Sequence, residues 1–213
     1  MDAQTLGMFA IASLVLAMTP GPDMMLLASR SMTQGRGAGF AALCGAMLGC
    51  FCHAMAAGLG LSKLFVLVPV AFDAVRLAGA AYLFYLAWTT MRSKPSAAGA
   101  APEPMPLWVI ARQGLLTNLL NPKVALFMLA LLPQFMHPEQ GGLMGQVLLL
   151  SAIQLATGLL VNVAVILASA GFAGWISGRL RASKAAWRAR LPNVLLGGVF
   201  AGLAVRLAWG GVK

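Results

Sequence analysis

Two interruptions inside apolar runs carry the side chains that could do chemistry in this sequence. The first is Thr19-Pro20-Gly21-Pro22-Asp23 and the second is Asn118-Leu119-Leu120-Asn121-Pro122-Lys123. Proline has no N–H and its ring crowds the carbonyl four residues earlier, so Pro20 and Pro22 release two carbonyls from the helical ladder. A carboxylate at one break and an amine at the other could bind the ammonium and carboxylate groups of a substrate, or a proton.

The composition shows in what kind of protein these breaks occur. Of 213 residues, 60% are hydrophobic and 9% are charged, whereas about 25% of the residues in soluble domains are charged. This indicates an integral membrane protein, and we expect a single transmembrane domain over residues 1–213. The formal net charge is +10, but Lys and Arg lie mainly between or at the ends of apolar runs. There they set topology and contact lipid headgroups rather than nucleic acid.

Apolar runs of about 20 residues predict membrane-spanning helices. The sequence contains six of them, at residues 5–28, 38–61, 75–91, 110–133, 143–176 and 192–209. The stretch 61–73 is apolar but contains Lys63, Pro69 and Asp73. We interpret it as an interfacial connection, with an extension of the second helix as the alternative.

The segment at residues 94–104 is rich in Pro, Ala and Gly and predicts a flexible linker. We therefore expect a first three-helix repeat over residues 1–91, a cytoplasmic linker over 92–109 and a second three-helix repeat over 110–213. Lys and Arg concentrate in the first, third and fifth connections and are absent from the fourth. This pattern makes the odd-numbered connections cytoplasmic and places both termini outside.

The two breaks occupy equivalent places in the two halves, because Pro22-Asp23 and Pro122-Lys123 differ by 100 positions. An odd number of spans per half makes the halves face opposite ways across the membrane, as in transporters built from inverted repeats. The sequence thus predicts an all-α fold of six transmembrane helices in two inverted three-helix repeats, with helices 1 and 4 broken. Gly21 and Asn121 precede prolines as N-cap residues do, so each break could offer a half-helix N-terminus to a carboxylate.

The two charges admit two interpretations. Asp23 could hold an ammonium group or a proton, and Lys123 needs an anion because it follows the positive end of a half-helix. A zwitterion meets both needs, which favours amino acids as substrates. The alternative is a buried Asp23–Lys123 pair that only joins the halves, although ionisable residues inside membranes are usually functional.

The second predicted helix holds further polar and small residues. His53 lies inside the apolar run and could relay protons or simply pack. Cys50 lies three positions before it, but two ligands on one helix are too few for a metal site. Gly45 and Gly49 allow close helix approach, either inside the bundle or at a dimer interface.

Together these motifs resemble the LysE/RhtB family of bacterial amino-acid exporters. The resemblance rests on the two breaks and on the stretches 34–39, 79–83 and 131–135 and the glycines of the last run. It implies six helices in the bacterial inner (plasma) membrane, proton-driven export of amino acids or close derivatives, and often a homodimer. It also implies functional roles for Asp23 and Lys123, with Asn118 and Asn121 beside them. The polar residues of the fifth run, Gln154, Thr157 and Asn162, match no family motif.

We therefore expect a multi-pass secondary exporter and not an enzyme. Its substrates would be of the homoserine, threonine, leucine or lysine type, exchanged for protons, and no cofactor, metal or nucleic acid is expected. The expected binding residues are Asp23, Lys123, Asn118, Asn121 and Thr19, the breaks lie at Pro20, Gly21, Pro22 and Pro122, and His53 is a candidate proton relay. The alternatives are a heavy-metal or cation exporter on the same scaffold and an intramembrane thiol oxidoreductase using Cys50 and Cys52. The second is weakened because the two thiols face different directions.

Overall fold

The described part of the chain is helical throughout. The computed structural model describes residues 1–60, 69–92, 105–140, 142–180 and 191–209. Its α-helices are α1 (Ala3–Met18), α2 (Pro22–Gln34), α3 (Arg36–Gly58), α5 (Pro69–Arg92), α6 (Leu107–Leu119), α7 (Pro122–Leu126), α8 (Leu143–Leu180) and α9 (Leu191–Trp209). A π-helical turn η1 (Phe127–Leu131) and two 3-10 turns, η2 (Leu132–Phe135) and η3 (Pro138–Gln140), follow α7. For these residues the prediction of an all-α fold is confirmed.

Several helix ends differ from the predicted ones. Helix α5 begins at Pro69, so the last part of the predicted interfacial connection is helical, with proline at a position where a helix tolerates it. The rest of that connection, 61–68, lies outside the described residues, as do most of the predicted linker and residues 181–190. Helix α6 begins at Leu107, inside the predicted linker range. Helix α8 continues to Leu180, beyond the predicted end at residue 176.

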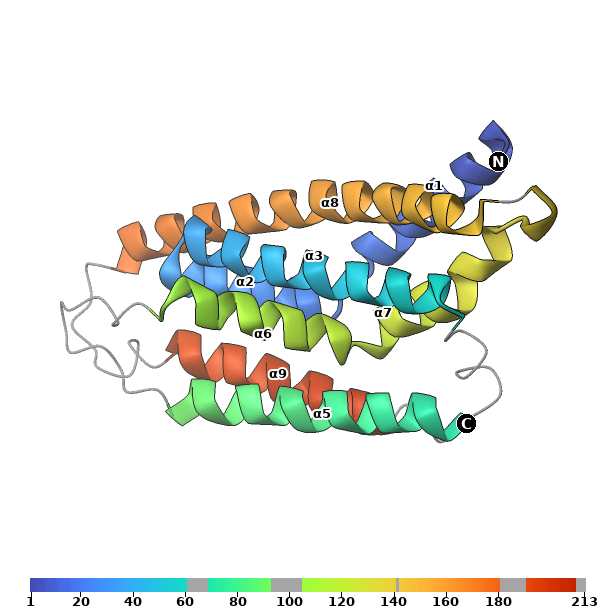
Figure 1. Cartoon of the computed structure of the whole chain (residues 1–213). Helices are drawn as coiled ribbons and strands as arrows, with labels where there is room; N and C mark the ends of the chain where they lie inside the picture. The colour runs from blue at the N-terminus through green and yellow to red at the C-terminus, as the bar shows by residue number, and fades with distance from the viewer. Residues whose placement is uncertain (61–68, 93–104, 141, 181–190, 210–213) are drawn as a thin grey trace.

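The helices form an elongated bundle, and the N-terminal end of α1 projects beyond it behind α8 (Figure 1). Helix α3 packs on α6 and α8, while α8 also packs on α1 and α2, and α5 pairs with α9. The α2–α3 corner, the start of α6 and the end of α8 gather at one end of the bundle, and the N-terminus lies at the other (Figure 1). Segments far apart in the sequence therefore meet at the breaks.

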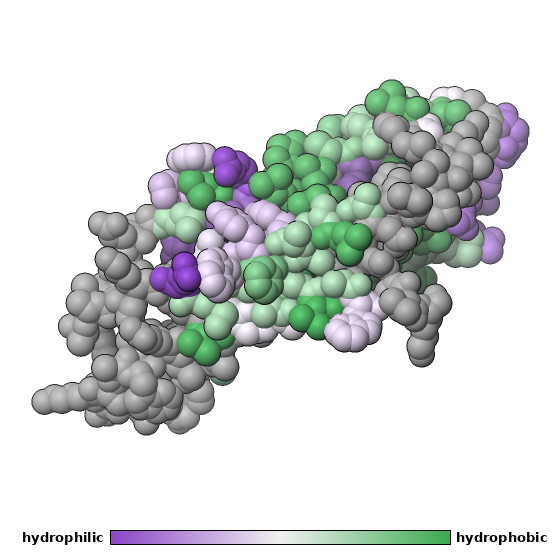
Figure 2. Space-filling view, turned by 90° about the horizontal axis from the view of Figure 1, so that it is seen from below, coloured by the Kyte–Doolittle hydropathy of each residue, from purple (hydrophilic) through white to green (hydrophobic). Residues whose placement is uncertain are grey.

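The outer surface of the bundle suits a lipid environment. Helix α3 and residues Leu143–Phe172 of α8 are each long and apolar enough to cross a membrane, and the two bent pairs raise the number to four if each pair is one span. Large apolar side chains point outward, among them Ile11, Val15 and Leu160. Figure 2 shows mainly apolar residues across the middle of one face and strongly polar residues towards its ends. The count of six spans and their inversion remain predictions.

Two glycines bring α3 and α6 into backbone contact. A Cβ at Gly45 would overlap the carbonyl oxygen of Ala111, and one at Gly114 would overlap that of Ala42. A Cβ at Gly49 would lie 2.9 Å from the Cβ of Asn118. The Gly45–Gly49 motif thus packs against α6 within the bundle. The predicted homodimer would therefore need a different interface.

We expect Gly45→Ala to destabilise the protein. The added methyl group must push α3 away from α6, because a backbone carbonyl cannot move aside by changing rotamer. Overpacking of this kind lowers the free energy of unfolding by about 1–3 kcal/mol. The midpoint of thermal unfolding in detergent should fall by about 2–12 °C. Gly171→Ala is the matched control, because a Cβ there meets nothing within 4 Å; equal melting of both variants would contradict the close approach.

Candidate functional site

The helix breaks occur where the prolines predict them. Helices α1 and α2 meet at a bend of 54°, and α6 meets the segment Pro122–Phe135 at a bend of 52°. Gly21 is the N-cap of α2 and Asn121 is the N-cap of α7, each followed by proline in the first turn. The Asn121 side chain accepts a hydrogen bond from the Lys123 N–H at 3.1 Å. The predicted pair of N-cap–proline starts is confirmed.

At each break, proline removes the helical N–H donor of one carbonyl, and a side chain from another helix contacts that carbonyl oxygen instead. Pro20 cannot donate to the carbonyl of Leu16, and this oxygen accepts from Lys123 Nζ at 3.1 Å. The same ammonium group donates to the carbonyl of Thr19 at 2.8 Å. Pro122 cannot donate to the carbonyl of Asn118, and His53 Nε2 lies 3.3 Å from that oxygen. In the tautomer with hydrogen on Nε2, His53 stabilises the second break.

The carboxylate of the first break is held by the second break. Asp23 Oδ2 accepts hydrogen bonds from Asn118 Nδ2 and from Asn121 Nδ2, both at 2.9 Å. Lys123 of the second break in turn binds the carbonyls at the end of α1. The two breaks therefore bind each other in both directions, which explains how they stay together within an apolar bundle.

Lys123 and Asp23 do not form the buried ion pair that was the alternative interpretation of these two charges. Among the described residues the recorded ion pair is His137–Glu139, whereas Lys123 donates to backbone carbonyls. These carbonyls form the C-terminal, partially negative end of α1, a favourable place for a cation. The charge of Lys123 is thus compensated by α1, and Asp23 remains available to a ligand.

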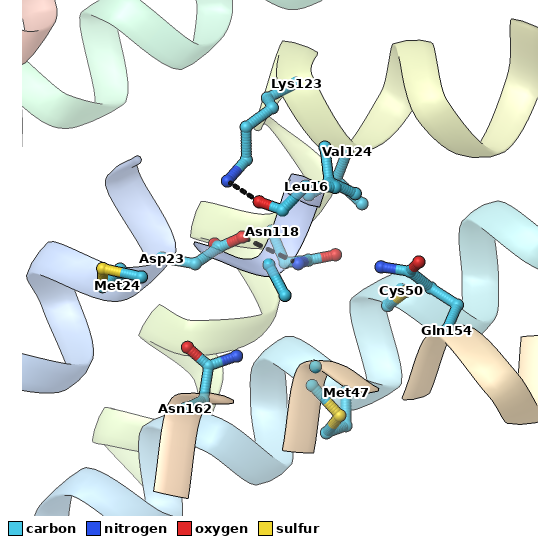
Figure 3. Close-up of a pocket in the computed structure, with 12 residues that line it drawn as sticks. Leu16, Asp23, Met24, Met47, Cys50, Asn118, Lys123, Val124, Gln154 and Asn162 are labelled. Carbon is cyan, nitrogen blue, oxygen red and sulfur yellow. Dashed lines mark hydrogen bonds between the residues drawn. The ribbon is translucent and has the colours of Figure 1, made fainter. Parts of the chain in front are cut away.

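Asp23 and Lys123 nevertheless line one small cavity (Figure 3). Its volume is about 50 Å³. It is lined by Leu16, Ala17, Asp23, Met24, Met47, Cys50, Asn118, Lys123, Val124, Gln154, Gly158 and Asn162. The wall combines apolar side chains with polar groups, and the polar groups come from both breaks and from α8.

Three residues of this wall have buried oxygen atoms without hydrogen-bond partners. They are Oδ1 of Asp23, Oδ1 of Asn118 and Oε1 of Gln154. A buried acceptor without a donor costs about 1–3 kcal/mol. The unpaired atoms at the cavity are all acceptors, so a ligand group with several N–H donors is the natural complement.

The other sequence-predicted residues lie around the cavity rather than in its wall. The side chain of Thr19 is exposed and donates to the carbonyl of Val15 in its own helix, so only the Thr19 carbonyl takes part. Asn121 donates a hydrogen bond to Asp23, and His53 contacts the Asn118 carbonyl at the second break. Pro20, Gly21, Pro22 and Pro122 form the breaks themselves.

The residues of α8 were missed as site residues. Gln154, Gly158 and Asn162 all line the cavity. A spacing of four residues puts them on one helix face, and polar residues at such spacing in an apolar run were the available signal. Thr157, the other polar residue noted in this run, donates to carbonyls of its own helix.

The cysteines show no arrangement for metal or disulfide chemistry. Cys50 is buried, whereas Cys44 and Cys52 are exposed, and all three are free. Neither a disulfide nor a group of three or more His, Cys, Asp or Glu side chains suited to a metal ion occurs among the described residues. The different exposure of Cys50 and Cys52 agrees with the expectation that they face different directions.

An apolar helical bundle with two broken helices around a charged cavity defines a membrane protein of the kind that includes secondary transporters. The family model described as LysE type translocator matches residues 14–211. The chain therefore belongs to the LysE family.

Named relatives cover most of the chain. A leucine efflux protein of Salmonella choleraesuis is 28% identical over 94% of this chain and 92% of its own length. A homoserine/homoserine lactone efflux protein of Salmonella typhi is 29% identical over 80% of this chain and 82% of its own. An uncharacterized membrane protein of Pseudomonas aeruginosa is 28% identical over 94% and 93%. No solved structure matches the chain.

Proposed function

We propose that this protein exports amino acids across the bacterial inner membrane in exchange for protons. The observation that carries the proposal is a cavity at which two helix breaks together present one carboxylate and one ammonium group. Membership of the LysE family and the efflux proteins among the relatives support it.

The charges of the cavity fit the two ends of an amino acid. Asp23 Oδ1 has no partner and is available for the substrate ammonium group. An ammonium group has three N–H donors, of which Lys123 uses two for the carbonyls of Leu16 and Thr19. Its third N–H is left for the substrate carboxylate. Neither charge has to give up an existing hydrogen bond for the substrate to bind.

The apolar wall favours a neutral substrate side chain. Met24 and Met47 line the cavity, and methionine adapts its shape to different apolar groups. Among the residues that line it, Asp23 is the sole carboxylate, so a lysine-type side chain would find no second anion. The relatives named as leucine and homoserine efflux proteins agree with neutral amino acids as substrates.

The cavity must widen to admit such a substrate. Its volume of about 50 Å³ is below the roughly 300 Å³ at which typical ligand pockets begin. The two bends provide positions at which the half-helices can tilt, and we infer that the narrow cavity seen here alternates with wider forms open to either side. Protonation of Asp23 would release the ammonium group outside, and deprotonation would prepare the site for the next substrate.

The helix contacts support six spans in two inverted halves. Under such an inversion the pair α1–α2 corresponds to α6–α7, α3 to α8 and α5 to α9. The contact of α3 with α6 then corresponds to that of α8 with α1, and the contact of α3 with α7 corresponds to that of α8 with α2; all four contacts are present. With the Lys- and Arg-rich connections in the cytoplasm, both termini lie in the periplasm.

Efflux from loaded cells tests the proposed function. Cells that overproduce the protein are loaded with dipeptides of single amino acids, and release of each amino acid is followed with and without an uncoupler. We expect faster release of at least one neutral amino acid, and loss of that increase when the proton gradient collapses. Release equal to that of cells without the protein, for every amino acid, would refute the proposal.

The contact of His53 allows a test of its predicted role as a proton relay. His53 reaches the carbonyl of Asn118, and a glutamine can donate to the same oxygen without titrating near neutral pH. We therefore expect His53→Gln to keep the pH dependence of export, with at most a severalfold lower rate, and His53→Phe to lower thermal stability. A changed pH profile in His53→Gln would assign His53 to the proton pathway instead.

A further inference from the structure

Helix α8 contributes a polar side chain to the cavity for which the two breaks give no explanation. Gln154 is 6% exposed and lies on the α8 face that also carries Gly158 and Asn162. Its Oε1 atom is buried and has no hydrogen-bond partner. A buried amide in an apolar helix normally pairs, so its unpaired oxygen requires a reason.

Gln154 lies across the cavity from Asp23 (Figure 3). Figure 3 shows the Asn118 amide between Asp23 and Gln154, with its nitrogen on the Asp23 side and its oxygen on the Gln154 side. The nitrogen is engaged with Asp23 Oδ2, whereas the oxygen is unpaired. The Gln154 amide can present either its oxygen or its nitrogen by rotating through half a turn, since the two ends have nearly the same shape.

We propose that Gln154 binds the primary ammonium group of the substrate together with Asp23 and Asn118. The inference rests on the proposed function and names the chemical group that this part of the site selects. A primary ammonium group has three N–H donors, and helices α2, α6 and α8 each supply one unpaired oxygen. In Figure 3 the Gln154 nitrogen faces Asn118, so the Gln154 amide makes half a turn to present its oxygen to the ammonium group. Binding would pair all three acceptors at once, which neither a hydroxyl group nor an N-alkylated amine can do.

The site should therefore discriminate against N-methylated amino acids. An N-methyl group replaces one donor with an apolar group and leaves one buried acceptor unpaired, which costs about tenfold or more in affinity. Removing the Gln154 acceptor should remove this penalty, because the methyl group then meets an apolar wall. Gln154 thus acts on substrate choice, whereas Asp23 acts on every ammonium substrate.

The test compares efflux of the best exported amino acid and of its N-methyl derivative, each loaded into the same cells. We expect the wild-type preference for the primary amine to fall about tenfold in Gln154→Leu. Gln154→Met, which keeps the unbranched shape, is measured beside it and should behave alike, so one variant serves if the other does not fold. Thr157→Val is the matched control on the same helix, because the Thr157 hydroxyl bonds only its own backbone in the structure.

The outcomes separate this inference from the proposed function. An unchanged preference in both Gln154 variants, with efflux still present, would overturn the inference and leave the proposed function standing. The same holds if the variants change a sodium requirement of efflux, since the three oxygens would then serve a sodium ion. Absence of any amino-acid efflux from wild-type cells would overturn the proposed function and this inference with it.

Discussion

Asp23→Asn is expected to abolish export driven by the proton gradient. Asparagine has nearly the shape of aspartate. Its side-chain oxygen can take the place of Asp23 Oδ2 and accept the hydrogen bonds from Asn118 and Asn121. It has no charge to attract an ammonium group and takes up no proton. The fold should therefore persist while gradient-driven efflux falls at least about a hundredfold, a typical loss when an opposite charge at a buried ion site is removed. Efflux from energised vesicles with an imposed pH gradient measures it.

Asp2→Asn is the matched control for Asp23→Asn. Asp2 lies at the N-cap of α1, where its Oδ1 accepts from the Thr5 N–H at 2.8 Å. The side chain and backbone of Thr5 hold the pKa of this exposed carboxyl below its ordinary value, so Asp2 stays ionised at neutral pH. Asparagine caps a helix about as well as aspartate, and we expect wild-type export. Wild-type, gradient-driven export by Asp23→Asn would refute the role of Asp23.

Lys123→Met is expected to lower export of amino acids at least about a hundredfold and also to destabilise the protein. The variant loses the N–H group left for the substrate carboxylate and leaves the Thr19 carbonyl without its donor. Removal of a charged hydrogen-bond donor costs about 1.5–3 kcal/mol, so the midpoint of thermal unfolding should fall by about 3–12 °C. Efflux and thermal unfolding in detergent measure the two effects separately.

A purely structural Lys123 would behave differently. In that case Lys123→Met would slow efflux of an amino acid and of the corresponding amine without a carboxylate by the same factor. A carboxylate-binding Lys123 predicts that only the amino acid is affected strongly. Arg112→Met, which removes an exposed cation near the start of α6, controls for the general loss of positive charge.

Much of this site follows from the sequence because prolines and charges inside apolar runs are conspicuous. The breaks at Pro20 to Pro22 and at Pro122, the two N-caps and the convergence of Asp23, Asn118 and Lys123 could all be predicted from residue type and position. An apolar run leaves a charge few solutions other than a polar partner in a matching place. The inverted halves remain an inference from this pairing and from the helix contacts.

The partners of each group could not be predicted, because they depend on how helices pack. Nothing in the sequence says that Lys123 turns to the carbonyls at the end of α1 rather than to Asp23, or that His53 reaches the Asn118 carbonyl. The backbone contact at Gly45 decides how close α3 lies to α6, and with it the place of His53. The sequence shows Gln154 as a polar residue in an apolar run, but only the helix packing shows that it faces the cavity.

The π-helical turn at Phe127–Leu131 also had no signal in the sequence. Its residues are ordinary helix formers, and three of them, Phe127, Met128 and Leu129, are buried in the core. The Phe9 ring packs against Phe127 and Phe135 with centroids 5.6 and 5.1 Å apart. These ring contacts and the packing of η1 on α3 are tertiary contacts that local propensity does not describe.

Binding of three related ligands tests the shared site most directly. The ligands are an exported amino acid, its analogue without the amino group and its analogue without the carboxylate, measured by calorimetry on the wild-type protein, Asp23→Asn and Lys123→Met in detergent. A shared site predicts that Asp23→Asn loses the preference for the amino acid over the analogue without the amino group and keeps the other preference. Lys123→Met should show the reverse. If both variants lose the same preference, or neither loses any, the two charges do not bind the two ends of one substrate.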